Sequence, residues 1–302
     1  MTSPSHDATT RRRVALALLT GVGAISLAAI FFRETAPTHP LVAAGLRLVL
    51  ASLLLLPALG RAIARGTVTR QVLRAGLAAG AFYAVHFGAW VSSLHLTSVA
   101  AATTLVTATP LLLGLVALIT GRDRAPRALW LALALATAGV VVIASGHSAE
   151  SPDAVTGDAL ALLGAGAMAG YLLVARSLGA ALPLWAFTAI ATATGGLLLS
   201  ITALGSGVSL VPASPRAAAF IVAAALLPQL VGHTALTWAL RHATPTRVGL
   251  ATVGEPALST LWAWLWLGEA VGLQVAAGCA LTLGAVLLAL RPAVRPAAPA
   301  PG

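Results

Sequence analysis

The sequence is poor in cysteine and in charge, and both shortages exclude common classes of protein. Its single cysteine, Cys279, cannot form an intramolecular disulfide and provides no cysteine-based metal site. Only 9% of the 302 residues are charged, against about 25% in soluble globular domains. With 59% hydrophobic residues and a mean hydropathy of +0.94, the chain has too little polar surface to cover a water-soluble body. These values predict an all-α polytopic membrane protein.

Lysine is absent, so all 18 basic residues are arginines. A nucleic-acid-binding surface gathers its basic residues in one patch or stripe. Here the arginines stand at the ends of apolar runs, where they anchor helices at the lipid headgroups. The net charge of +10 therefore indicates a lipid bilayer as the partner and no nucleic acid.

The sequence also lacks the motifs that identify most enzymes. It contains no H-E-x-x-H helix, Walker A loop, G-x-S-x-G elbow or Rossmann glycine run. Glu255 is the only carboxylate deep inside an apolar run, so a paired acid and base is missing. We therefore expect no enzyme, no catalytic residue, no metal and no cofactor. Without a nucleotide site, a proton or solute gradient is the energy source for any transport.

Ten apolar runs, most of them near the roughly 20 residues of a membrane-spanning helix, follow one another along the chain. They cover residues 14–32, 39–59, 73–94, 98–120, 126–145, 157–175, 181–204, 217–240, 247–267 and 271–290. The most polar connector, which contains Glu150 and Asp153, follows the fifth run. The expected divisions are a cytoplasmic tail at 1–13, a first five-helix repeat at 14–145, an external linker at 146–156, a second five-helix repeat at 157–290 and a cytoplasmic Pro/Ala tail at 291–302. Residues 1–10 and 292–302 have no apolar period and are expected to be disordered.

The arginines also predict the orientation of the spans. Fifteen of them fall in the tails and in one set of alternate loops, and only Arg33 and Arg216 fall in the other set. Because arginine is enriched in cytoplasmic loops, we expect both termini in the cytoplasm and the protein in the inner or plasma membrane. Arg47 fits neither set, since it lies about eight residues into the second span. It either snorkels to the outer surface or counters a carboxylate.

The two halves repeat several residues in the same order. Pro110 aligns with Pro256 at an offset of 146, and His86 aligns with His233 at an offset of 147. Because each half has an odd number of spans, the second half enters the membrane with the opposite polarity. The pattern predicts two inverted repeats, an arrangement that places a solute site near the midplane and allows one half to rock against the other.

Two stretches carry a family resemblance: HFGAWVSSLHLTSVAAATTLVTATPLL at 86–112 and PQLVGHTALTWALRHATPTRVGLATVGEPALSTLWAWLWLGE at 228–269. With the GEP motif at 254–256 and the LGE motif at 267–269, the chain resembles the EamA-type ten-span transporters of the drug/metabolite transporter superfamily. The resemblance implies a central cavity between two inverted halves. It also implies export of amino acids or related small metabolites, without fixing the substrate.

Glu255 is the strongest functional candidate, because a charge at the centre of a span costs about 2.5–3.5 kcal/mol even on the lowest scale. It lies eight residues beyond Arg247, which places it about 12 Å inside the membrane edge and requires it to face the protein interior. Two roles are open. The carboxyl group could bind a proton or the amino group of a solute. Alternatively, it could satisfy the backbone next to Pro256, whose ring leaves the carbonyl four residues earlier without a donor.

His86 and His233 lie at similar depths from opposite faces, as inverted symmetry requires. Each could relay a proton or make a hydrogen bond between helices. Tyr83, His86 and Trp90 share one helix face, as do Gln229 and His233, and an aromatic wall with a few polar tips suits an amphipathic solute. The proton-coupling candidates are Glu255, His86 and His233, and the predicted solute-binding residues are Tyr83, His86, Trp90, Thr107, Tyr171, Gln229, His233 and Glu255.

Together these features predict a secondary transporter that exports amino acids or related small metabolites by alternating access, with proton coupling as one option. Two other functions stay open. One is an exporter of cations or multiple drugs, with Glu255 as the counter-charge, and the other is a membrane scaffold subunit without transport. A pure scaffold has little reason to bear the desolvation cost of a central Glu, His and Gln set. The sequence gives no indication of the oligomeric state.

Overall fold

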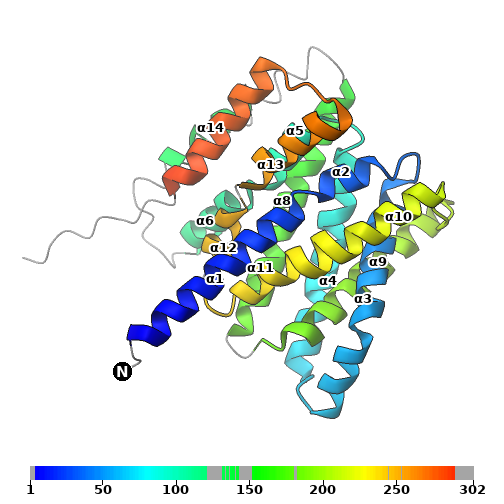
Figure 1. Ribbon diagram of the computed structural model, residues 1–302, viewed down its shortest axis with the longest axis vertical. Helices are drawn as coiled ribbons and strands as arrows, with labels where there is room; N and C mark the ends of the chain where they lie inside the picture. The colour runs from blue at the N-terminus through cyan, green and yellow to red at the C-terminus, as the bar shows by residue number, and fades with distance from the viewer. Residues whose placement is uncertain are drawn as a thin grey trace, which may run out of the picture.

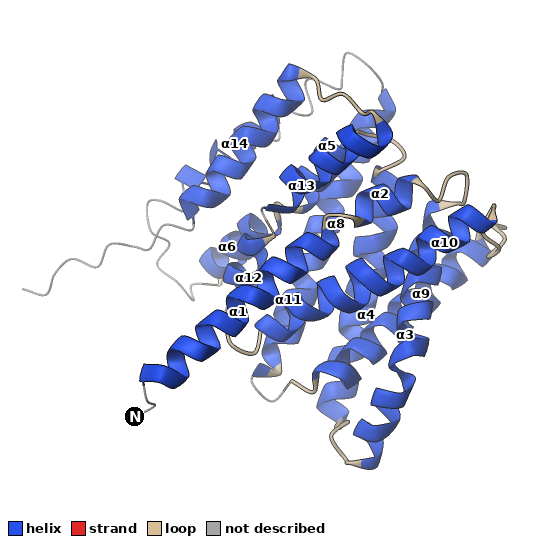
Figure 2. Ribbon diagram, in the orientation of Figure 1, coloured by secondary structure: helices blue, strands red, loops and turns tan. Residues whose placement is uncertain are grey.

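The structure is a computed structural model that describes residues 4–120, 131–132, 134–135, 137–139, 141–142, 152–179, 182–243, 245–252 and 254–289. These residues form helices joined by turns and irregular segments, with no strand among them (Figure 2). The all-helical fold is therefore confirmed for this part of the chain. Arg122, Arg124 and Arg127, which contributed to the predicted orientation, lie outside it.

The helices follow the order of the predicted runs (Figure 1). Those of the first half are α1 (Pro4–Ile25), α2 (Ala28–Arg33), α3 (Pro40–Ala64), α4 (Arg70–Ser93), α5 (Val99–Val106) and α6 (Thr109–Ile119). Those of the second half are α8 (Pro152–Ser177), α9 (Leu184–Gly205), α10 (Pro215–Ala224), η2 (Ala225–His233), α11 (Thr234–Ala239), α12 (Pro245–Ala251), α13 (Gly254–Trp262), η3 (Ala263–Leu267) and α14 (Leu273–Ala289). The two η segments are π-helices, with a wider turn than an α-helix.

Local sequence explains where several helices begin. Thr69, Ser98 and Ser214 precede α4, α5 and α10, and each side chain accepts a hydrogen bond from a backbone N–H group of the first turn. Prolines occupy the first turns of α3 and α10, where the missing N–H group has no helical partner to lose.

Seven helical stretches in the described part of the chain are long and apolar enough to cross a membrane. They are Arg12–Arg33, Pro40–Ala64, Arg70–Ser93, Val99–Val116, Asp153–Ser177, Leu184–Gly205 and Pro215–Ala239. They correspond to the first four runs and to the sixth, seventh and eighth. The ninth run is divided into α12, α13 and η3, the tenth contains the shorter apolar helix α14, and the fifth, 126–145, lies mostly outside the described residues. A total of ten spans stays a prediction.

Two segments begin differently from their prediction. The expectation that residues 1–10 are disordered is wrong for residues 4–10, which form the first turns of α1. Proline is favourable at the first helical position. In the same way, α8 begins at Pro152, inside the expected linker 146–156. The earlier part of that linker and the tail 291–302 lie outside the described residues.

The two halves pack against each other in pairs that repeat symmetrically. The third span, α4, packs on the sixth, α8, and correspondingly the eighth, through η2 and α11, packs on the first, α1 (Figure 1). The second and seventh spans, α3 and α9, pack on each other in opposite directions, since Gly45 lies next to Leu199 and Val49 lies next to Gly196. Equivalent helices that run antiparallel require halves of opposite orientation, so this packing agrees with inverted repeats.

The α3–α9 contact depends on glycine. A Cβ atom on Gly196 would lie 2.8 Å from the backbone nitrogen of Val49 and 3.1 Å from the carbonyl oxygen of Gly45. Only the absence of a side chain lets the two backbones approach so closely. Around this contact the core is aromatic, and it encloses an arginine: the largest fully buried side chains include Arg47, Tyr83, Tyr171, Phe32, Phe87 and Phe187.

Candidate functional site

The fourth and ninth runs are both interrupted, at positions that the internal repeat makes equivalent. In the fourth run α5 ends at Val106 and α6 begins at Thr109, and in the ninth run α12 ends at Ala251 and α13 begins at Gly254. Each interruption lies just before a proline, Pro110 or Pro256, at the repeat offset of 146. The half-helices pack crosswise: the first half of the fourth run, α5, packs on the second half of the ninth, α13, and α6 packs on α12. Two broken helices therefore meet in the middle of the bundle.

The carbonyl group that each proline leaves without a helical donor is satisfied in a different way. Before Pro110 this is Val106 O, which accepts a hydrogen bond from Thr109 Oγ1 at 3.0 Å. Before Pro256 it is Thr252 O, which accepts from the backbone N–H of Glu255 at 2.9 Å. The backbone role considered for the Glu255 carboxyl group is thus filled by that residue's own N–H group.

A cavity of about 50 Å³ lies between the two broken helices and their neighbours. It is small beside the pockets of drug-sized ligands, which measure about 300–1,000 Å³. The cavity is lined by six of the eight predicted solute-binding residues: His86, Trp90, Thr107, Tyr171, His233 and Glu255. Ile25, Leu172 and Val248 are among the apolar residues of its wall. The site is therefore an apolar chamber with a few polar groups.

Each half contributes one histidine to the chamber, and the ring centroids of His86 and His233 lie 6.4 Å apart. Nδ1 of His86 is 2.8 Å from Gly164 O. Because a carbonyl oxygen only accepts, Nδ1 carries the hydrogen, and in the neutral ring Nε2 is an acceptor. The bond also ties the third span to the sixth, so the His86 ring has a fixed orientation.

Tyr171 and Tyr83 form an aromatic pair on one side of the chamber. The hydroxyl of Thr237 donates to His233 O at 2.7 Å, so its oxygen accepts the hydrogen of the Tyr171 hydroxyl at 2.8 Å. Tyr83 stacks on Tyr171 with ring centroids 4.0 Å apart and an interplanar angle of 10°. Tyr83 does not line the cavity, and it supports the wall from behind.

Gln229, the other predicted residue that does not line the cavity, is bonded to Arg47, whose Nη2 donates to Gln229 Oε1 at 2.6 Å. Arg47 is fully buried, which rules out snorkelling to the surface. Its partner is an amide and not a carboxylate. The guanidinium carbon lies 3.8 Å from the centroid of the Phe87 ring, and that ring contacts both chamber histidines.

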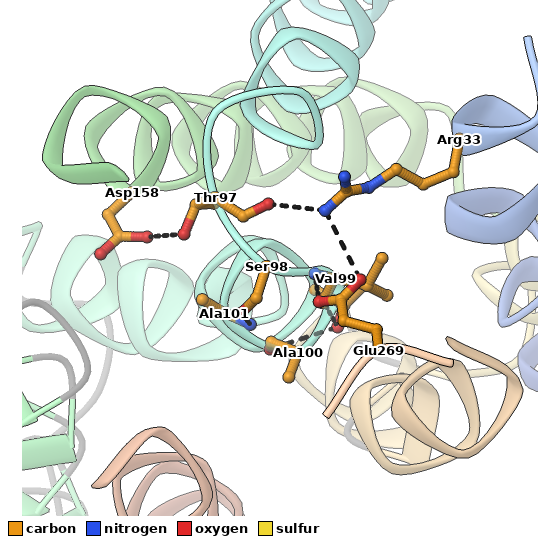
Figure 3. A network of polar contacts seen from close by, with 9 residues as sticks. Arg33, Thr97, Ser98, Val99, Ala100, Ala101, Asp158 and Glu269 are labelled. Carbon is orange, nitrogen blue, oxygen red and sulfur yellow. Dashed lines mark hydrogen bonds and ion pairs between the residues drawn. The ribbon is translucent and has the colours of Figure 1, made fainter. Parts of the chain in front are cut away.

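A polar network at one end of the bundle connects the two halves (Figure 3). Arg33 Nη2 donates to Thr97 O at 2.9 Å and lies 3.5 Å from the Glu269 carboxylate. Glu269 Oε1 accepts from Val99 N at 2.7 Å and so caps the N-terminus of α5. Thr97 Oγ1 donates to Asp158 Oδ1 at 2.9 Å. Glu269 and Asp158 belong to the second half, and the other three residues belong to the first.

A second set of contacts joins the halves at the same end. Arg216 donates to Glu34 Oε2 through Nε at 3.0 Å and Nη2 at 2.6 Å, and Trp266 Nε1 donates to Glu34 Oε1 at 3.0 Å. The nearby His95 has a lowered pKa because of its partial burial and the neighbouring Arg33 and His39, so it adds no charge there at neutral pH. We call the connected residues the rim: Arg33, Glu34, Thr97, Val99, Asp158, Arg216, Trp266 and Glu269.

At the opposite end, the arginine contacts stay within one half. Arg176 Nη1 donates to Leu240 O at 2.7 Å, and Arg241 Nε donates to Leu182 O at 3.0 Å. All four residues belong to the second half. The described arginines thus join the two halves at the rim, whereas at the opposite end they bond within the second half.

The model of the EamA-like transporter family matches the chain twice, over residues 12–145 and 155–291. The chain belongs to the EamA-like transporter family. The resemblance seen in the sequence is therefore confirmed, and the two matches show the two repeats of an EamA-like transporter. Each repeat carries one broken helix and one chamber histidine.

A solved structure shares the fold of this EamA-like transporter. It is a crystal structure titled only "Crystal structure of protein", with 22% sequence identity and a TM-score of 0.67, and the match covers 93% of this chain and 98% of that chain. At this identity the likeness supports the fold alone. A comparison with curated proteins finds no match.

The sequence missed three kinds of site residue in this EamA-like transporter. Thr109, Thr237 and Thr252 line the chamber, but threonines scattered in apolar helices have no distinguishing pattern. The Arg47–Gln229 pair joins residues that are 182 positions apart. Of the rim residues, the arginines Arg33 and Arg216 served as markers of orientation, and the LGE motif that ends in Glu269 was a signal for one more.

Proposed function

We propose that this EamA-like protein is a secondary exporter of amino acids or related small metabolites. In this proposal the solute passes through the chamber as the halves, 14–145 and 157–290, rock against each other. The observation that carries it is the meeting of Glu255, His86 and His233 from both halves in one apolar cavity. Burying titratable groups inside a membrane bundle is costly, and a scaffold subunit gains nothing from them. The small volume of the chamber favours a small metabolite over drug-sized cargo.

Glu255 is the group best placed to bind a proton or an amino group. Its side chain lines the cavity and is 8% exposed. It makes no hydrogen bond or ion pair with the part of the chain that the structure describes. Because the Pro256 break is closed by a backbone N–H group, protonation of the carboxylate would leave the helix intact. His86 and His233 are the further candidates for proton transfer along the same chamber.

Export is the direction that the family resemblance implies, and the rim has a place in such a cycle. On the predicted topology both termini are cytoplasmic, the rim lies on the external side, and the bonds of Arg176 and Arg241 lie on the cytoplasmic side. In the proposed cycle, the contacts between the halves across the rim close the external side while the solute enters the chamber from the cytoplasm. Opening the rim would then release it outside the inner or plasma membrane. This cycle is alternating access.

An uptake screen in proteoliposomes with an imposed pH gradient tests the proposal. We expect small amino acids or related metabolites to accumulate in response to the gradient. Glu255→Gln should abolish the response to pH while the protein is inserted and folded normally. Asp153→Asn, which changes an exposed carboxylate at the start of α8, is the matched control and should behave like the wild type.

Three outcomes would contradict parts of the proposal. If no metabolite moves in either direction, the scaffold function replaces transport. If only organic cations move, the protein is a cation or multidrug exporter with Glu255 as the counter-charge. If Glu255→Gln transports normally at every pH, the proton-coupling role is wrong.

A further inference from the structure

Arg47 is a buried charge that the proposed cycle does not yet use. It lies on α3 with 0% exposure, and it forms no ion pair within the described residues. Its stabilising contacts are the hydrogen bond to Gln229 and the faces of two rings, Phe87 at 3.8 Å and Phe32 at 5.3 Å from the guanidinium carbon. Such contacts hold the side chain in place, but they do not neutralise its charge.

Most of the unsatisfied groups around Arg47 are hydrogen-bond donors, and the exception is the Tyr83 hydroxyl, which can donate or accept. Nε and Nη1 of Arg47 and Nε2 of Gln229 are buried without a partner in the described part of the chain. The same holds for Nε1 of Trp90, which lines the chamber. Leaving a buried donor unpaired is unfavourable. These donors outnumber the one hydroxyl that could accept from them, so a group that satisfies the rest must be an acceptor, and a guanidinium group beside a carboxamide suits a carboxylate.

Glu255 shows the opposite deficiency. It is a carboxylate in the chamber wall without a donor from the described residues, and it interacts electrostatically with Arg47 without touching it. The site thus has an acceptor that lacks donors and donors that lack an acceptor. A zwitterion has the complementary groups, since an ammonium group only donates and a carboxylate only accepts.

The Phe87 ring connects Arg47 to the chamber. The ring contacts the guanidinium group and the Tyr83 ring, and it also contacts the rings of His86 and His233, at centroid distances of 4.4 Å and 5.2 Å. Both histidines line the cavity. A carboxylate that enters beside the histidines would therefore reach the guanidinium group once the Phe87 ring turns aside.

We propose that Arg47 and Gln229 form a carboxylate subsite for the transported solute, with Glu255 as the ammonium subsite, so that the preferred solute is a zwitterion of no net charge. The inference rests on the proposed transport function and narrows its substrate class. A cationic solute would neutralise Glu255 and leave Arg47 without a counter-charge in a low-dielectric interior, whereas a zwitterion neutralises both.

Three related probes test this subsite at neutral pH: the zwitterion L-leucine, the cation L-leucinol and the anion N-acetyl-L-leucine. Binding is measured by the shift of the thermal unfolding midpoint, and transport by uptake into proteoliposomes. If the uptake screen selects another amino acid, the same three derivatives of that amino acid are used. We expect the wild type to prefer the zwitterion by about tenfold or more, the effect of one lost hydrogen bond to a charged group.

Two variants and one control separate the subsite from general damage. Arg47→Gln should remove the preference, with affinity for the zwitterion falling about tenfold and affinity for the cation kept or increased. Gln229→Glu gives Arg47 an internal carboxylate of nearly the same shape, so it should block the zwitterion and spare the cation while the protein stays folded. Arg61→Gln removes an exposed arginine from the same helix and should leave the preference unchanged.

The outcomes distinguish this inference from the proposed function. If the wild type transports L-leucinol as well as L-leucine, the subsite is wrong and the transport function stands. If no probe or metabolite moves, the transport function itself fails. If Arg47→Gln does not fold, Gln229→Glu decides, because an unchanged preference in that variant overturns the subsite.

Discussion

The fourth and ninth spans are both broken just before a proline, but the residue that precedes the proline has a different role in each. Thr109 and Glu255 are equivalent positions of the repeat, at an offset of 146. In the fourth span Thr109 also lines the chamber, but its hydroxyl is bonded to the backbone, to Val106 O, and lies 3.2 Å from Ala165 O. In the ninth span a backbone N–H group closes the break, and the Glu255 side chain is left to line the chamber.

The comparison shows how a symmetric bundle acquires an asymmetric site. Both halves supply a broken helix, a proline and a histidine, so the framework of the chamber is duplicated. The carboxylate is present in one copy only. Where a backbone N–H group bonds to the free carbonyl at the break, the side chain is not needed for that bond and can be a carboxylate. The two copies of the broken helix can therefore differ at this position.

The largest expected effect comes from making the ninth span like the fourth. Glu255→Thr should reduce transport driven by a pH gradient about tenfold or more, the usual contribution of a positioned proton-transfer group or of a charged binding contact. Thermal stability should be unchanged or higher, because the variant removes a buried carboxylate and keeps the N–H bond to Thr252 O. Transport and the unfolding midpoint are measured on the same preparation.

A swapped variant gives the control for this prediction. Thr109→Glu combined with Glu255→Thr returns a carboxylate to the chamber from the other half, and we expect part of the pH response to return. Full wild-type transport by Glu255→Thr alone would show that the two spans do not differ in function. Thr109 and Glu255 would then differ only in how they pack at the breaks.

The next effect concerns stability. Thr109→Val keeps the shape of the side chain but leaves Val106 O without a donor, so we expect a loss of about 1–3 kcal/mol in the free energy of unfolding. Thr192→Val is the matched control, because the Thr192 hydroxyl bonds to carbonyl groups in the interior of the unbroken helix α9, which already have helical donors. Denaturant unfolding in detergent measures both. Equal losses in the two variants would show that the break has no special need for a hydroxyl group.

Much of this arrangement was predictable because membrane helices obey simple rules. The apolar runs locate the seven described spans, and the paired prolines and histidines reveal the repeat. Six of the eight predicted site residues line one cavity, since a polar side chain inside a span must face the protein interior. His86 and His233 could be placed together from the sequence, because their depths are related by the inverted symmetry.

The other features of the site depend on contacts between distant residues, which no local sequence pattern indicates. The role of Arg47 is set by Gln229, a residue 182 positions away, and by a π-helical stretch in the eighth span that the apolar period does not indicate. Gln229 and His233 were predicted to share a face, but only His233 lines the chamber. The donor to Thr252 O is set by the backbone geometry at the break. The apolar runs locate a span but do not predict which group makes this hydrogen bond.

The smallest expected effect concerns the outer ends of the same two spans. Glu269, at the end of the ninth span, caps the fourth at Val99 and pairs with Arg33. The corresponding residues of the first half, Arg122 at an offset of 147 and Asp123 at an offset of 146, lie outside the described residues. Glu269→Gln keeps an acceptor for Val99 N and loses a partly exposed ion pair of 3.5 Å, so we expect a loss of no more than about 1 kcal/mol in unfolding free energy, smaller still at high salt. If the rim closes the transporter, the variant should also transport faster or leak solute at low salt, whereas a change in stability alone would make Glu269 a helix cap and nothing more.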